Sequence, residues 1–123
     1  MNTILLYLGA LFTTLWGVAH LIPTKSVVKG FGEISNDNRH IITMEWIVEG
    51  VSLIFIGVLV GTVTIIDPVS IVSRAVYSIA AVGLIVLAIV SLLTGFKVKM
   101  LPFKLCPIIF TASALLILIG GVL

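Results

Sequence analysis

The chain has 123 residues, of which 60% are hydrophobic and only 10% are charged, with a formal net charge of +2. Soluble domains carry about 25% charged residues, so this composition excludes an ordinary soluble protein and indicates an integral membrane protein. The basic residues form no nucleic-acid-binding patch, and we expect no nucleic-acid partner. The single cysteine, Cys106, excludes an intramolecular disulfide, a paired-cysteine redox motif and a cysteine-only metal site.

Four stretches are apolar enough to cross a membrane, which takes about 20 residues. Proline or charged residues separate them, at Pro23, at Asp67-Pro68 and at Pro102. The first stretch lacks the basic start and the cleavage pattern of a signal peptide and is interpreted as a retained span. The chain is therefore predicted to be a single transmembrane domain, an all-α bundle of four transmembrane helices. The predicted spans are residues 2–22, 41–66, 69–96 and 105–123, within a domain of residues 1–123.

The segment after the first span is predicted to form a short amphipathic helix in the membrane interface. Val27, Phe31 and Ile34 recur at helical spacing, with lysines on the opposite side that point toward lipid headgroups. Gly30 and Gly32 weaken this helix, because each glycine costs about 1 kcal/mol relative to alanine in a helix interior. We therefore expect about a turn and a half of helix rather than three turns.

Basic residues in short loops predict the orientation of the chain. All but one lie in the first and third loops, which face the same side of a four-span protein, and only Arg74 lies near the second loop. The first and third loops are therefore expected in the cytoplasm, with both termini outside, in a multi-pass protein of the cell membrane. The basic residues of these two loops are Lys25, Lys29, Arg39, Lys97, Lys99 and Lys104.

Several residues of the spans have ordinary roles in membrane proteins. Gly57 and Gly61 form a small-xxx-small pair with Gly50 on nearly the same face, so another helix can approach closely there. Tyr77 and the two tryptophans are interpreted as aromatic residues of the membrane–water interface.

Two carboxylates lie four residues apart near the start of the second span. Glu45, Glu49 and Ser52 form one stripe on this helix, turned well away from its glycines. Counting about 20 residues back from Ile66 puts Glu45 at the interface and Glu49 just inside the hydrocarbon. Ionisable groups inside a membrane are costly and usually functional, so Glu49 needs a partner, a proton or water more than Glu45 does.

A comparable polar stripe on the first span consists of Thr13, Trp16 and His20. His20 lies near the same membrane surface as Glu45, so pairing of the first two spans places these side chains at similar depth. Polar side chains from all four spans therefore gather at the cytoplasmic end of the bundle. Those contributed by the third and fourth spans are Ser91, Thr94 and Cys106.

This end is predicted to hold a polar pocket built from His20, Glu45 and Glu49. A histidine can exchange a proton or hydrogen-bond the polar head of a ligand, so the leading hypothesis is binding of a small amphipathic ligand that resembles a quinone or a lipid. The protein would then serve as an accessory subunit of membrane redox or lipid chemistry. The predicted ligand-binding or proton-binding residues are His20, Glu45, Glu49, Trp16, Thr13, Ser52 and Trp46.

Other functions stay open. One is a proton-coupled transporter or channel that works as an oligomer, since four short helices alone enclose little space. Another is a structural subunit that docks a membrane partner through its glycine faces, with the polar groups as interhelical glue. His20, Glu45 and Glu49 are acceptable ligand types for zinc or non-haem iron, but their spacing matches no known signature and no metal is predicted. The sequence names no cofactor and leaves catalysis undecided.

The first span resembles the small DoxX-like membrane proteins. The resemblance rests on the segments LGALF (residues 8–12) and WGVAHL (residues 16–21) and on the four-span length. In that broad family a glycine-bearing first helix often ends in a similar Gly-x-x-His-Leu pattern, which carries over only to Gly17 and His20. The resemblance implies a four-helix bundle, in some members an accessory subunit of a membrane oxidoreductase.

Overall fold

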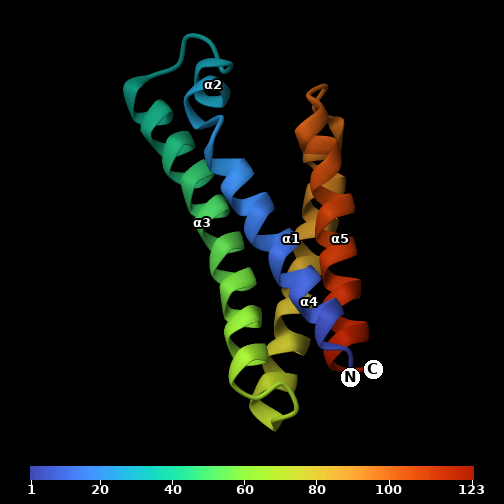
Figure 1. Ribbon diagram of the computed structural model, residues 1–123. Coiled ribbons are helices and arrows are strands. Elements are labelled where there is room, and N and C mark those ends of the chain that lie inside the picture. Colours follow the sequence, from blue (N-terminus) through green and yellow to red (C-terminus); the bar gives the residue numbers. More distant parts are fainter.

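The computed structural model describes all 123 residues, and its regular secondary structure is entirely helical (Figure 1). Four helices are long and apolar enough to cross a membrane, and a short helix lies between the first two, which confirms the predicted all-α fold class. In chain order the elements are α1 (Thr3–Leu21), α2 (Thr24–Lys29), α3 (Asn36–Ile66), α4 (Ile71–Leu93), the short 3-10 helix η1 (Gly95–Lys97) and α5 (Leu101–Gly121).

The long helices form two antiparallel pairs, α1 with α3 and α4 with α5, and α1 also packs along α5. Figure 1 shows both termini and the connection between α3 and α4 at one end of the bundle, with α2 at the other. At the terminal end the Asn2 amide donates to the Gly120 carbonyl at 2.8 Å, which ties the chain ends together. Helices α3 and α4 touch little away from their connection.

Helix ends follow capping residues rather than hydropathy. The side chains of Asn2, Ser35 and Ser70 each accept a backbone N–H in the first turn of the helix that follows. Ser35 lets α3 begin at Asn36, five residues before the apolar run. Helix α5 begins at Leu101 without a side-chain cap, and Pro102 lies in its first turn, where proline is tolerated.

Helix α3 is longer than a membrane is thick. Its 31 residues span about 46 Å at 1.5 Å per residue, whereas the hydrocarbon core is about 30 Å thick. Since Asp67 marks the end of the apolar run, the first turns of α3 project beyond the hydrocarbon at the end of the bundle that carries α2.

The tightest helix contact lies between α1 and α3. A Cβ atom added to Gly17 would lie 2.7 Å from the Gly50 carbonyl oxygen, and one added to Gly57 would lie 2.6 Å from the Ala10 carbonyl oxygen. The expected close approach is confirmed at Gly50 and Gly57, where only a hydrogen atom fits. Gly61 makes an ordinary contact, with the nearest atom, Ala10 Cβ, at 3.8 Å from an added Cβ.

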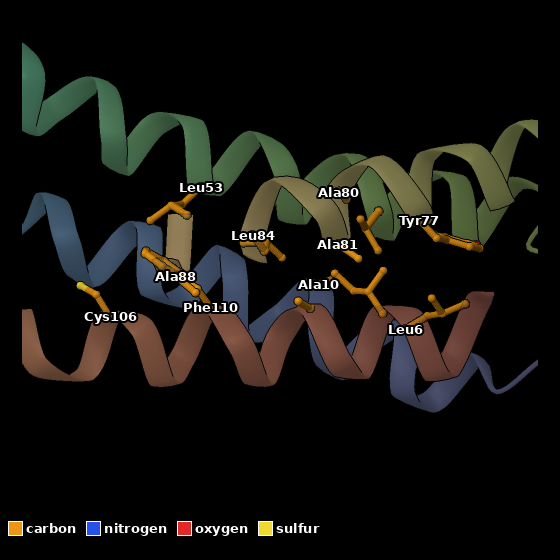
Figure 2. Close-up of a cluster of buried hydrophobic side chains, with 13 residues drawn as sticks. Leu6, Ala10, Leu53, Tyr77, Ala80, Ala81, Leu84, Ala88, Cys106 and Phe110 are labelled. Carbon is orange, nitrogen blue, oxygen red and sulfur yellow. The ribbon is translucent and has the colours of Figure 1, made fainter. Parts of the chain in front are cut away.

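The interior receives side chains from all four long helices (Figure 2). Leu6 of α1, Leu53 of α3, Leu84 of α4 and Phe110 of α5 are almost fully buried. These side chains fill the space between the two helix pairs and leave the outer faces of the helices to the lipid.

The interpretation of Tyr77 as an interfacial residue is wrong. Its side chain is 0% exposed, and its hydroxyl lies 3.0 Å from Thr64 Oγ1 in a hydrogen bond between α4 and α3. The ring packs against Gly121 so closely that a Cβ there would overlap it. A buried tyrosine requires a partner for its hydroxyl, and Thr64 of the neighbouring helix supplies it.

Helix α2 covers six residues, which confirms a helix of about a turn and a half. Its buried residues are Val27 and Val28, whereas Phe31, expected on the apolar face, is 55% exposed and lies beyond the helix. The helix ends at Lys29 with Gly30 as its C-cap, and Gly32 has φ +74°, a conformation that only glycine adopts at little cost.

Replacement of Gly57 by alanine tests the α1–α3 contact. We expect Gly57→Ala to lower the free energy of unfolding by about 1–3 kcal/mol, as overpacking does, because α1 must move away. Gly83→Ala is the matched control, since an added Cβ there meets no atom within 4 Å. Thermal unfolding of the two variants in detergent makes the comparison, and equal stability would contradict the proposed backbone contact.

Candidate functional site

A pocket of about 430 Å³ lies at the end of the bundle nearest α2. This volume falls within the range of about 300–1,000 Å³ that small-molecule sites occupy. Its wall is mostly apolar and combines α1, α3, α4, η1 and α5, so no single segment of the chain forms it. The lining residues from the second half of the chain are Val90, Ser91, Thr94, Gly95, Pro102, Phe103, Leu105 and Cys106.

His20 and Glu49 face each other in this pocket. His20 Nε2 lies 3.4 Å from Glu49 Oε2, and the exposed fractions of the two side chains are 6% and 39%. His20 Nε2 is buried and has no hydrogen-bond partner. The pair therefore brings together a carboxylate and an imidazole nitrogen that still has hydrogen-bonding capacity.

Trp46 holds His20 in place from the neighbouring helix. The two rings are stacked, with centroids 3.9 Å apart and an interplanar angle of 16°. The indole Nε1 also donates to the His20 carbonyl oxygen at 2.7 Å. On its other side Trp46 meets Phe103 of α5, with ring centroids 5.6 Å apart. Aromatic and imidazole rings from α1, α3 and α5 thus form a continuous part of the wall.

Trp16 and Cys106 complete the wall between α1 and α5. Trp16 Nε1 is buried without a hydrogen-bond partner, and an indole N–H can only donate. The Cys106 thiol instead donates to the Pro102 carbonyl oxygen at 3.4 Å. The indole N–H meets the Cys106 sulfur, which is a weak acceptor, and no nitrogen or oxygen atom, so it stays available to a stronger acceptor at the pocket wall.

Pro107 interrupts the hydrogen bonding of α5 next to the pocket. It is buried inside the helix and, lacking an N–H, cannot donate to the carbonyl of Phe103 four residues earlier. The first turn of α5, which carries Phe103, thus lacks one of the bonds that would join it to the rest of the helix.

The pocket wall includes Trp16, His20, Trp46 and Glu49, all named as candidates from the sequence. Thr13 is buried elsewhere and donates to the Gly9 carbonyl oxygen at 2.8 Å.

Glu45 and Ser52, also named from the sequence, are exposed and lie outside the wall. Viewed along the axis of α3, Glu45 and Trp46 lie on opposite sides of Glu49. The pocket lies on the same side as Trp46.

The three residues considered for a metal site do not come together. No group of three His, Cys, Asp or Glu side chains converges in the structure. Only His20 and Glu49 share the pocket, because Glu45 faces outward.

Sequence reasoning missed Pro102 and Phe103, which lie in a segment predicted to be a loop. The signal that could have found them is Pro102 itself, since proline is tolerated in the first turn of a helix but not in its interior. A helix that begins just before Pro102 extends the predicted last span at its N-terminal end. Its first turn then includes Phe103.

No protein-family model, curated protein or solved structure matches the chain. The resemblance of the first span to DoxX-like proteins thus has no family match to support it, although the four-span architecture that it implies is present. Function is inferred from the residues of the pocket.

Replacement of each tryptophan by phenylalanine separates a hydrogen-bonded indole from an unpaired one. Trp46→Phe removes the bond to the His20 carbonyl, and we expect a loss of about 1 kcal/mol of stability beyond the loss of packing. Trp16→Phe deletes the same atoms but removes an N–H that meets only the weakly accepting Cys106 sulfur, so it should cost less or be neutral. Thermal unfolding of both variants decides, and a larger loss in Trp16→Phe would contradict the assigned bonding.

Proposed function

We propose that the protein binds a small amphipathic ligand of quinone-like character in this pocket. The observation that carries the proposal is the His20–Glu49 pair, 3.4 Å apart, set in a pocket whose wall is otherwise mostly apolar and aromatic. Pockets that recognise small molecules combine apolar walls with a few placed polar groups that orient the ligand. A flat apolar body with one polar head fits this division.

The polar groups suit both a carbonyl and a hydroxyl on the ligand. His20 Nε2 can donate to a carbonyl or accept from a hydroxyl, whereas the Glu49 carboxylate accepts from a hydroxyl. The Trp16 N–H, whose neighbour within the chain is the weakly accepting Cys106 sulfur, offers a further donor for a carbonyl. An unsatisfied buried donor costs about 1–3 kcal/mol, so a ligand that pairs with it recovers part of that cost.

The membrane positions of these residues support an amphipathic ligand. Glu49 lies just inside the hydrocarbon, counted from the far end of α3, and the polar first turns of α3 lie outside it. A ligand head between His20 and Glu49 would therefore sit near the interface, with its apolar part toward the bilayer interior. We assign this end to the cytoplasm on the basis of the basic residues in the first and third loops.

An accessory role in membrane redox or lipid chemistry follows from this proposal. The pocket would hold or deliver the ligand, and the reacting groups would belong to a partner. Docking of a partner through Gly50 and Gly57 is disfavoured, because α1 of the same chain already covers these glycines.

Proton-coupled transport is the second candidate, favoured by the same two titratable groups within a membrane-spanning bundle. Intramembrane pairs of ionisable residues commonly mark proton paths. On this alternative, vesicles containing the protein would change their internal pH when a gradient is applied, and Glu49→Gln would abolish the change. If the protein only binds a ligand, the internal pH will change no faster than it does in empty vesicles.

The binding proposal is tested with a short-chain ubiquinone titrated against the protein in nanodiscs, with quenching of tryptophan fluorescence as the readout. We expect Glu49→Gln to weaken binding about tenfold to a hundredfold, since a hydrogen bond to a charged group contributes about 1.5–3 kcal/mol. Glu45→Gln is the matched control, because that side chain lies outside the pocket, and it should bind as the wild type does.

The double variant His20→Phe, Glu49→Gln lacks both polar groups of the pocket, so the quenching that remains in it reports quinone dissolved in the lipid. That quenching is subtracted from the signal of the other proteins. Wild-type affinity in Glu49→Gln, or an equal loss in Glu45→Gln, would rule out the pocket as the quinone site. Native mass spectrometry of the purified wild type, searched for a copurified mass that Glu49→Gln lacks, identifies a natural occupant independently.

A further inference from the structure

A second groove, of about 410 Å³, lies between α2 and the first turns of α3 and shares no residue with the pocket. Four of its seven lining residues are basic: Lys25 and Lys29 of α2, and Arg39 and His40 of α3. No acidic residue lines it. The groove thus gathers basic side chains from two helices around one concave surface.

The two walls of the groove are held in place. Val27 and Val28 are buried and anchor α2, and Val28 also lines the groove. The two lysines are four residues apart and therefore share one face of α2.

Two threonines of the groove use their hydroxyl protons within the protein. Thr24 Oγ1 donates to the Leu21 carbonyl oxygen at 2.6 Å, and Thr43 Oγ1 donates to the Arg39 carbonyl oxygen at 2.7 Å. The donors that stay free to meet a ligand are the basic groups themselves, which makes an anion the matching ligand.

The positive charges of the groove have no carboxylate partner. The contact between His20 and Glu49 is the only one within 4.0 Å between a basic side chain and a carboxylate in the structure. Lys25, Lys29 and Arg39 therefore have no direct carboxylate contact, although Glu33 and Asp37 lie in the same connecting region, and like charges gathered around one groove repel one another. A bound anion would relieve that repulsion.

The groove lies at the depth of lipid phosphates. Its α3 residues lie within the first eight of that helix, in the part that extends beyond the hydrocarbon, and α2 follows directly after the end of α1. The headgroup layers add about 5–8 Å on each side of the hydrocarbon. We infer that this groove binds the phosphate group of an anionic phospholipid.

The test titrates detergent-purified protein with phosphatidylglycerol or with phosphatidylcholine of the same acyl chains, and counts bound lipids by native mass spectrometry. We expect the wild type to prefer phosphatidylglycerol. The triple variant Lys25→Gln, Lys29→Gln, Arg39→Gln should lose about 100-fold in affinity at low ionic strength, because each basic residue near an anionic surface contributes about fivefold. Binding of phosphatidylcholine should not change.

The matched control is Lys97→Gln, Lys99→Gln, Lys104→Gln, which removes the same charge from the same end of the bundle but outside the groove. It should keep the preference for phosphatidylglycerol. An equal loss of phosphatidylglycerol affinity in both triple variants would mean that overall positive charge, and not the groove, binds the lipid, and would overturn the proposal. Equal binding of the two lipids by the wild type would overturn it as well.

Inorganic phosphate at millimolar concentration separates a lipid headgroup from a free phosphate. If phosphate displaces phosphatidylglycerol from the wild type, the groove recognises phosphate irrespective of the acyl chains. If it does not, the lipid is the ligand. Circular dichroism checks the fold of each variant, and Arg39→Gln alone, with an expected loss of about fivefold, replaces the triple variant should that one unfold.

Discussion

Backbone contact between α1 and α3 sets the relative position of His20, Trp46 and Glu49 in the pocket. Gly17 and Gly50 allow the two helix backbones to approach until an added Cβ would lie 2.7 Å from a carbonyl oxygen. His20 lies one turn beyond Gly17, and Glu49 is the neighbour of Gly50, so the same contact fixes the distance between imidazole and carboxylate. Because the two helices cannot slide past each other without a backbone clash, His20, Glu49 and the Trp46 ring stacked on His20 keep fixed relative positions.

The two ends of the bundle differ in how completely their polar groups are satisfied. At the terminal end, Thr64 and Tyr77 hydrogen-bond across helices, and the Asn2 amide bonds to the Gly120 carbonyl. Three buried side-chain atoms in the structure have no partner, and two of them belong to Trp16 and His20 of the pocket. Membrane interiors penalise unpaired polar groups, and two of these three atoms lie at the end of the bundle that carries the pocket.

The sequence alone predicted the fold and part of the candidate site, for different reasons. Four long apolar stretches leave few alternatives to a helical bundle. The polar stripes predicted His20, Glu45 and Glu49 together, whereas Glu45 lies outside the pocket wall. Rotation of α3 by a fraction of a turn decides between Glu45 and Trp46, and hydrophobic patterning does not resolve such a rotation. Tyr77 was misread because Thr64, the partner of its hydroxyl, lies on another helix.

The position of Pro107 gives the pocket walls unequal stiffness. On one side, glycines hold the backbones of α1 and α3 in close contact. On the other side, the first turn of α5 lacks one helix hydrogen bond, because Pro107 has no N–H to donate to the Phe103 carbonyl. Proline within a helix is a common origin of kinks. If the pocket holds a ligand as proposed, adaptation to occupants of different size would fall to the α5 side, where Phe103 could tilt with its turn while the histidine and the carboxylate stay fixed. Shape selectivity and chemical selectivity would then reside on opposite walls and could change independently.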